Sequence, residues 1–131
     1  MLNKVVFSKK SDHWETPRDL YELLDQEFHF DFDPCPIHAN FDAFNVNWGG
    51  VIFINPPYSN IKNFLSKGLA EMQAGHAKTL VYLIPSRTDT CWFHELILAN
   101  KAEIRFIKGR LKFQGGKYSA PFPSMVVVFR K

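Results

Sequence analysis

The four residues Asn55-Pro56-Pro57-Tyr58 have the clearest chemical potential in the sequence. They follow Val51–Ile54, an apolar run that is too short for a buried helix and is typical of a buried strand. Because proline has no backbone N–H, two consecutive prolines leave carbonyl acceptors on a stiff turn, and the Asn55 side chain adds another acceptor beside them. The sequence therefore predicts a rigid, acceptor-rich corner with an aromatic ring, Tyr58, attached to it.

A corner of this kind suits the exocyclic amino group of a nucleobase. The lone pair of adenine N6 is delocalised into the ring, so this nitrogen is a poor nucleophile. The side-chain oxygen of Asn55 and the carbonyl of Pro56 can accept both N–H groups and stabilise the positive charge that develops when the nitrogen attacks an electrophile. Tyr58 can stack on the base, a contact worth about 1–3 kcal/mol. The alternative is a proline turn that merely ends a strand and carries a surface tyrosine.

Asn55-Pro56-Pro57-Tyr58 is similar to the catalytic motif of methyltransferases that modify adenine N6 or cytosine N4, and more of the chain resembles the phage-type DNA N6-adenine methyltransferases. The resemblance extends over nearly everything from residue 13 onward. It includes Trp14-Glu15-Thr16-Pro17, Asp31-Phe32-Asp33, Arg87-Thr88-Asp89-Thr90 with Trp92-Phe93-His94, Gly109-Arg110-Leu111-Lys112-Phe113 and Ala120-Pro121-Phe122-Pro123-Ser124. It implies methyl transfer from S-adenosylmethionine to adenine N6 in DNA, on a base flipped out of the duplex. The residues it implies for catalysis are Asn55, Pro56, Pro57 and Tyr58.

The resemblance also implies a set of cofactor-binding residues: Trp14, Thr16, Asp33, Pro34 and Asn55. An acid at position 33 suits the ammonium group of the donor, although a carboxylate that caps a loop is the alternative. The sequence departs from the common pattern of the family because no Gly-x-Gly follows Asp33. The short stretch before the motif strand also leaves little space for the usual second strand with its ribose-binding acid, for which Asp42 is a candidate substitute.

Positive charge is concentrated toward the end of the chain. Residues 101–131 carry 8 of the 16 lysines and arginines with one acid, Glu103, whereas residues 1–100 carry 8 basic and 12 acidic side chains. Such a local field attracts a polyanion even though the formal net charge is only +3. A charged, solvated sheet edge is the alternative, as is an ion pair between Arg87 and Asp89. Gly115-Gly116 indicates a mobile loop that closes on DNA. The expected DNA contacts are Arg87, Lys108, Arg110, Lys112 and Lys117.

The elements that must position these residues alternate between strands and helices. Helices are expected after the Thr16-Pro17 cap as far as Phe28, from Ser59-Asn60 to Gly75, and over about 89–99. Strands are expected at 29–33, 51–54, 79–84, 103–107 and 125–129. This order predicts an α/β fold with the ligand crevice at the carboxyl ends of the strands. We expect a small, reduced Rossmann-like sheet, mostly parallel, flanked by helices, with the last two strands as an antiparallel hairpin at its edge.

Length and composition fit one domain of 131 residues, with residues 1–12 as a loosely attached segment. The 46% of apolar and 22% of charged residues exclude a disordered or fibrous chain. No apolar run approaches the roughly 20 residues that span a bilayer, and the start lacks the pattern of a signal peptide. We therefore expect a cytoplasmic protein, in the bacterial host of a phage by resemblance. We expect no sizeable separate DNA-recognition domain in 131 residues. Sequence specificity is then either loose or dependent on a homodimer or on another subunit.

Two Cys-x-x-His pairs, Cys35 with His38 and Cys91 with His94, could together supply four zinc ligands. We do not expect a metal, because Trp92 and Phe93 place the second pair in an apolar helix that belongs to the core. The two cysteines are then free thiols. Two alternative functions stay open. One is a non-catalytic nucleic-acid-binding module, for example a methyltransferase that has lost cofactor binding. The other is an N4-cytosine methyltransferase.

Overall fold

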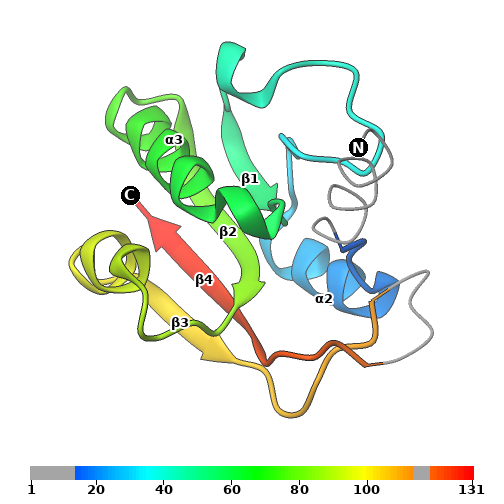
Figure 1. Cartoon of the computed structure of the whole chain (residues 1–131). Coiled ribbons are helices and arrows are strands. Elements are labelled where there is room, and N and C mark those ends of the chain that lie inside the picture. Colours follow the sequence, from blue (N-terminus) through cyan, green and yellow to red (C-terminus); the bar gives the residue numbers. More distant parts are fainter. Residues whose placement is uncertain (1–13, 114–118) are drawn as a thin grey trace, which may run out of the picture.

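A four-stranded mixed sheet forms the centre of the molecule (Figure 1). The structure is a computed structural model that describes residues 14–113 and 119–131. The strands lie in the order β1-β2-β4-β3, where β1 is Gly50–Ile54, β2 is Ala77–Pro85, β3 is Glu103–Phe106 and β4 is Ser124–Arg130. Strands β1 and β2 are parallel, whereas β4 is antiparallel to both of its neighbours. The α/β class is therefore confirmed.

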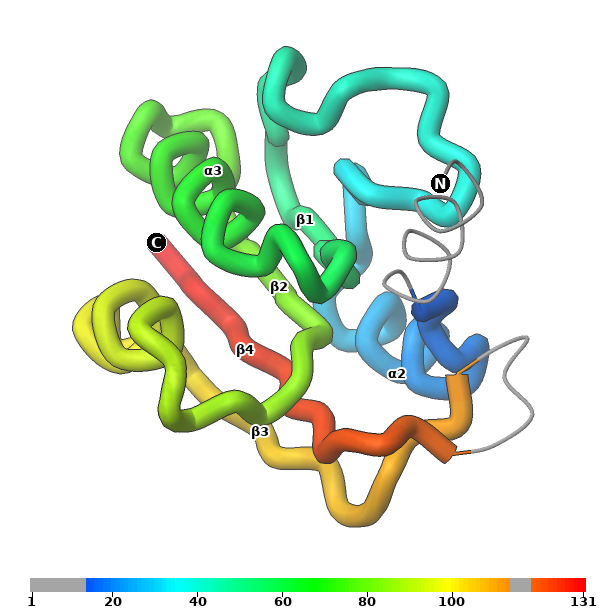
Figure 2. The backbone as a smooth tube through the Cα atoms, viewed as in Figure 1, coloured from blue at the N-terminus to red at the C-terminus, as the bar shows by residue number. Residues whose placement is uncertain are grey.

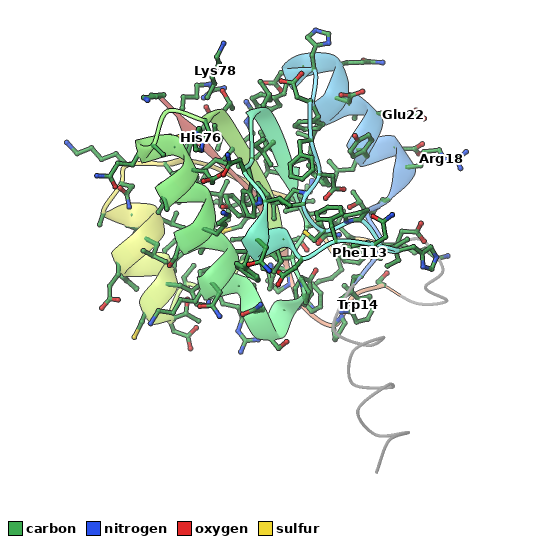
Figure 3. All side chains as sticks on the ribbon, turned by 90° about the horizontal axis from the view of Figure 1, so that it is seen from above. Trp14, Arg18, Glu22, His76, Lys78 and Phe113 are labelled. Atoms are coloured by element: carbon green, nitrogen blue, oxygen red, sulfur yellow. The ribbon has the colours of Figure 1, made fainter. Side chains whose placement is uncertain are left out.

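Helices cover both faces of the sheet because alternate strand residues point to opposite sides. Ile52 and Ile54 belong to one core cluster, together with helix α3 (Ile61–Gln73) and the π-helical turn η3 (Phe93–Leu98). Phe53 belongs to the other cluster, together with helix α2 (Arg18–Phe28) and residues of the 107–122 segment. Figure 3, viewed from above, shows α2 and α3 on opposite sides of the strands. The result is a three-layer arrangement with two cores.

The expectation of a mostly parallel sheet is not confirmed. Among the described strands one pair is parallel and two are antiparallel. The segment 29–33, expected as the first strand, forms a single parallel bridge from Phe32 to Ile52. The expected pairing of the last two strands is present and antiparallel, with β3 at the edge. However, the chain returns through residues 107–123 to insert β4 between β2 and β3, and this insertion makes the sheet mixed.

The helices form where the apolar spacing predicts them, with differences at their ends. Helix α2 begins at Arg18 with Pro17, rather than Thr16, at the N-cap position, and the carbonyl of Pro17 accepts from the Tyr21 N–H at 3.0 Å. Helix α3 is followed by Gly75, which has a φ of 87°. The third helix is π-helical in its central part, with an i to i+5 bond from the Ala99 N–H to the His94 carbonyl at 3.1 Å.

The connection between α2 and β1 follows a long arc before it enters the sheet (Figure 2). Its end is anchored by Trp48, which is fully buried and donates its indole N–H to the Ala43 carbonyl at 3.0 Å. The Trp48 N–H also donates to the Glu71 carboxylate of α3. Burial raises the pKa of Glu71, but this hydrogen bond and the nearby His76 and Lys67 outweigh it, so the pKa is lowered. The carboxylate thus ties the start of β1 to α3.

In the described ranges, none of the helices is long and apolar enough to cross a membrane.

Candidate active site

Asn55-Pro56-Pro57-Tyr58 leaves the carboxyl end of β1 as a buried corner between the sheet and α3. Asn55 is only 3% exposed and Pro56 is also buried. Pro57 is extended, with φ −57° and ψ 134°, and turns the chain into the short 3-10 segment η2 (Tyr58–Asn60), which leads directly into α3. The proline pair therefore fixes the path of the chain at the point where the strand ends.

The Asn55 side chain is held by the segment that precedes α2. Its Nδ2 donates to the backbone carbonyl of Trp14 and, at 2.9 Å, to Oγ1 of Thr16. The backbone carbonyl of Asn55 accepts from the Cys35 thiol at 3.3 Å. Side chain and main chain are thus fixed by residues that lie 20 to 41 positions away in the sequence.

A cavity of about 430 Å³ opens beside Asn55, between α2 and the loop that follows Asp33. Three of the five expected cofactor residues line it, namely Thr16, Asp33 and Asn55. The other lining residues are Glu15, Arg18, Tyr21, Glu22, Cys35, Pro36, Ile37 and Phe53. The wall combines apolar surface with several charged and polar groups that can orient a ligand, and the volume falls within the roughly 300–1,000 Å³ usual for small-molecule sites.

The two other expected cofactor residues, Trp14 and Pro34, are not among the residues that line this cavity. The Trp14 ring packs against Phe113 at 5.6 Å and edge-on against Phe122 at 5.8 Å between ring centroids. Trp14 and Phe113 are seen together in Figure 3. Pro34 is buried next to Asp33 in the sequence. The structure therefore brings neither side chain into the wall of this cavity.

Asp33 is the least exposed of the three carboxylates that line the cavity, since Glu15 and Glu22 are exposed. Its Oδ1 accepts from the Cys35 N–H at 2.9 Å, which lowers its pKa, but the dominant effect is burial, and the pKa rises from 3.8 to about 6. No salt bridge to Asp33 forms within the described residues. A cationic group bound next to this carboxylate would be favoured, because it would restore the ionised form.

Helix α2 contributes three lining residues that sequence reasoning missed: Arg18, Tyr21 and Glu22. Arg18 and Glu22 are exposed and project from the outer side of the helix (Figure 3). Their spacing of three and four residues was a usable signal, since such positions share one helix face. The loop residues Cys35, Pro36 and Ile37 carry no comparable pattern, because only the tertiary fold brings them to Asn55.

A second cavity, of about 120 Å³, lies on the Tyr58 side of the corner. The Tyr58 ring meets Phe122 edge-on, with 5.0 Å between centroids. This cavity shares no lining residue with the first, so the corner separates them, with Asn55 in one and Tyr58 in the other. Its lining residues are Tyr58, Ile61, Pro85, Arg87, Thr90, Trp92 and Phe122.

Arg87 is exposed and lines this second cavity, directly after β2. In the described part of the chain it forms no salt bridge with Asp89. The Arg87 carbonyl instead accepts from Oγ1 of Thr90 at 2.7 Å, which fixes the turn. Arg87 therefore borders the same cavity as Tyr58.

Three of the other expected DNA contacts, Lys108, Arg110 and Lys112, are exposed on the segment after β3. Since Pro85 pairs with Ser124 and Phe106 pairs with Met125, this segment leaves the sheet at the same end as the corner. Lys117 and Gly115-Gly116 lie outside the described residues.

The hypothesis of a four-ligand zinc site finds no matching geometry. Cys35 is buried under the Asn55 carbonyl, whereas Cys91 is exposed, and both are free thiols. No group of three or more His, Cys, Asp or Glu residues among those described is arranged to hold a metal ion. Asp42, the candidate ribose acid, accepts from the Phe44 N–H at 2.9 Å and does not line the first cavity. It caps the 3-10 turn η1 (Ala43–Asn45) instead.

The sequence matches the profile of the DNA N-6-adenine-methyltransferase (Dam) family over residues 4–131. It is also similar to two curated phage proteins, each named DNA N-6-adenine-methyltransferase. The protein of Haemophilus phage HP1 (strain HP1c1) is 31% identical over 76% of this chain and 65% of its own length. That of Escherichia phage T1 is 29% identical over 82% of this chain and 50% of its own length.

The chain thus spans between half and just under two thirds of the curated relatives it matches. No solved structure matches it significantly.

Proposed function

Because the chain belongs to the DNA N-6-adenine-methyltransferase (Dam) family, we propose that it transfers a methyl group from S-adenosylmethionine to the N6 amino group of adenine in DNA. The observation that carries the proposal is the placement of Asn55. This buried amide is fixed in a proline corner and borders the larger cavity, while Tyr58 of the same corner borders the smaller one. The corner can thus present acceptors to an amine at the boundary of two ligand sites.

The larger cavity suits the methyl donor in size and in charge. S-adenosylmethionine supplies an electrophilic methyl group on a sulfonium centre. The Asp33 carboxylate complements its ammonium group and the Arg18 guanidinium complements its carboxylate. Phe53 and Ile37 offer apolar surface for its adenine ring. Thr16 and Asn55 complete the wall, the Trp14 carbonyl accepts from the Asn55 amide, and none of these contacts involves a glycine-rich loop.

The acceptors of the corner act on the amino group of the target base. The Asn55 oxygen and the Pro56 carbonyl accept its N–H groups and stabilise positive charge on nitrogen during attack. Pro57 keeps these acceptors in place. The smaller cavity, with Tyr58 and Trp92 as aromatic walls, suits a base extruded from the duplex, since N6 of a stacked pair is shielded from the donor. Arg87 at this cavity suits a phosphate oxygen.

Transfer of a labelled methyl group tests the proposal directly. The protein is incubated with radiolabelled S-adenosylmethionine and DNA, and the DNA is digested to identify the modified nucleoside. N6-methyladenine is the expected product. N4-methylcytosine would change the target base, and the absence of transfer would favour a nucleic-acid-binding module without catalysis.

The variant Asn55→Ala is expected to lower kcat by about 100-fold, because it removes an acceptor aimed at developing charge. Asn100→Ala is the matched control, because Asn100 is exposed and its amide donates to the nearby Leu96 carbonyl at 2.7 Å, away from the corner. An Asn55→Ala protein that keeps full activity and its fold would contradict the assignment.

A further inference from the structure

The orientation of the Asn55 amide is set from outside the proline corner. Its nitrogen faces the segment 14–16, where the Trp14 carbonyl and the Thr16 hydroxyl each accept a hydrogen bond. A carbonyl can only accept, so a flipped amide would bring its oxygen against the Trp14 oxygen. The amide oxygen is therefore directed away from this segment.

This orientation decides whether Asn55 can serve an amino substrate. An amine that loses electron density to an electrophile is stabilised by acceptors, whereas N–H groups turned toward it would oppose the developing positive charge. An asparagine that was free to flip would present the wrong end for part of the time. The contacts at its nitrogen end thus bear on turnover, although they lie on the side away from the amide oxygen.

The main chain of Asn55 is fixed from a second direction. Cys35, which is 8% exposed, donates its thiol to the Asn55 carbonyl at 3.3 Å. The backbone N–H of Cys35 donates to the Asp33 carboxylate at 2.9 Å. One residue therefore joins the carboxylate of the larger cavity to the proline corner, and burial keeps its thiol protonated by raising its pKa.

We infer that Thr16 and Cys35 are positioning residues that hold the side chain and the main chain of Asn55 so that its oxygen faces the amino group. The inference rests on the proposed function and deepens it. Both residues also line the larger cavity, so the competing explanation is a direct role in holding the donor. A positioning role predicts that loss of the hydrogen-bonding group lowers kcat, whereas a role in holding the donor predicts that it lowers donor affinity.

Kinetics with paired variants separate these explanations. Thr16→Val keeps the shape but loses the acceptor, and Thr16→Ser retains it. Cys35→Ala loses the donor, and Cys35→Ser retains it. We expect each loss variant to lower kcat by about tenfold, as one hydrogen bond allows, with little change in donor Kd, and the retaining variants to stay within about threefold of wild type.

The control variants are Thr79→Val, near the opposite end of β2 from the corner, and Cys91→Ala, which removes the exposed thiol. Both should keep wild-type kcat. Unchanged kcat in Thr16→Val and Cys35→Ala would overturn the inference. The inference would also be overturned if the variants that lose the hydrogen-bonding group and those that retain it lost donor affinity to the same extent and kept wild-type kcat.

A measurement without turnover keeps this test separate from the proposed function. The side-chain amide signal of Asn55 in a ¹H–¹⁵N spectrum is assigned by its absence in Asn55→Ala. In Thr16→Val this signal should shift and exchange faster with solvent, whereas in Thr16→Ser and Thr79→Val it should stay near its wild-type position. An unshifted signal in Thr16→Val would refute the positioning role. A wild-type protein that methylates no adenine would instead refute the proposed function, and the amide signals would still decide the positioning role.

Discussion

At the scale of single residues, the side-chain nitrogen of Asn55 faces a hydrogen-bond acceptor, the backbone carbonyl of Trp14. This arrangement distinguishes asparagine from aspartate, although both side chains have the same shape. A carboxylate at this position would face the Trp14 carbonyl with an oxygen, in a place that is 3% exposed. Two acceptors that face each other without a proton, away from water, are unfavourable.

We therefore predict that Asn55→Asp lowers the free energy of unfolding by about 1–3 kcal/mol at neutral pH and also lowers methyl transfer. Urea denaturation measures the first effect. Asn60→Asp is the matched control, because the Asn60 oxygen already accepts from Asn63 at 2.6 Å and a carboxylate can do the same. Equal stability of Asn55→Asp and wild type would contradict the described orientation of the amide.

The buried carboxylate of Asp33 makes the free protein less stable at neutral pH. Burial raises its pKa to about 6, so the fold favours the neutral form over the ionised form. The stability this residue contributes is present below its ordinary pKa of 3.8 and is lost as the pH rises through about 6. At neutral pH the free protein therefore holds an unfavourable carboxylate.

We predict that Asp33→Asn stabilises the free protein at about pH 7.5 but not at about pH 4, because only the ionised carboxylate is unfavourable. Asparagine can still accept from the Cys35 N–H, so this bond does not confound the comparison. Thermal unfolding at the two pH values gives the result. A variant that is less stable than wild type at both values would contradict the burial effect.

The same carboxylate should make donor binding depend on pH. Affinity for S-adenosylmethionine is expected to fall as the pH drops below about 6, because protonation of Asp33 removes the partner of the ammonium group. Isothermal titration calorimetry over this range tests the effect, with Asp33→Asn as the variant that should bind weakly and without this pH dependence. A wild-type affinity that is constant across the range would exclude the ion pair.

At the scale of elements, helix α3 approaches the sheet closely at one point. A Cβ on Gly68 would collide with the hydroxyl of Tyr82. That hydroxyl is fixed, because Tyr82 is fully buried and donates to the Phe64 carbonyl at 2.8 Å. The glycine therefore allows α3 to pack against β2 and to hold the proline corner, which leads into α3.

We predict that Gly68→Ala lowers the free energy of unfolding by about 1–3 kcal/mol, although alanine favours a helix by about 1 kcal/mol. Ser66→Ala, on the exposed side of α3, should be neutral or slightly stabilising. Urea denaturation of both variants compares them. A stabilised Gly68→Ala would show that helix propensity outweighs the collision.

Helix α2 is fastened to the opposite side of the sheet by charged groups. Arg105 of β3 contacts both oxygens of Glu27, at 2.7 and 2.6 Å. Arg105 and Arg130 also lie over the Phe28 ring, 5.3 and 5.6 Å from its centroid, and both pair with Glu103. These contacts are at the surface and contribute little stability each, but together they fix the C-terminal end of α2, whereas its first half lines the larger cavity.

At the scale of the whole molecule, the same ion pairs redistribute charge. Two of the basic residues in the 101–131 stretch, Arg105 and Arg130, are neutralised by Glu27 and Glu103. Lys101, which precedes β3, and Lys131, whose N–H donates to the Lys78 carbonyl at 3.2 Å, lie at the far end of the sheet. Among the described residues of this stretch, the positive charge at the end of the sheet where the proline corner lies therefore comes from Lys108, Arg110 and Lys112.

We predict that Arg110→Ala lowers DNA affinity and reduces the slope of log K against log salt by about 0.9, the value for one phosphate contact. Lys78→Ala is the matched control, since Lys78 is exposed at the end of the molecule opposite Trp14 and Phe113 (Figure 3). Fluorescence anisotropy over a salt series provides both slopes. An unchanged slope for Arg110→Ala would remove this segment from the DNA interface.

The sequence by itself determined what local rules control. The strands at 51–54, 79–84, 103–107 and 125–129 and the helices before and after the proline corner follow from apolar spacing and from turn residues. The prediction of a strand at 29–33 was wrong, because this segment forms only one bridge, from Phe32 to Ile52, and this pairing depends on where β1 lies in the fold. The chemical type of Asn55-Pro56-Pro57-Tyr58 was also readable from the sequence, because proline and amide chemistry are local.

Only the tertiary structure decided the order of the strands and the partners of the site. The insertion of β4 between β2 and β3 depends on pairing across a long connection, which has no local signature. Thr16 was expected as a helix cap, but its hydroxyl accepts from Asn55. Cys35, expected as a free thiol, donates a hydrogen bond to the carbonyl of the same residue. Hydrogen bonds between residues far apart in sequence depend on packing of the whole chain, so no spacing rule predicts them.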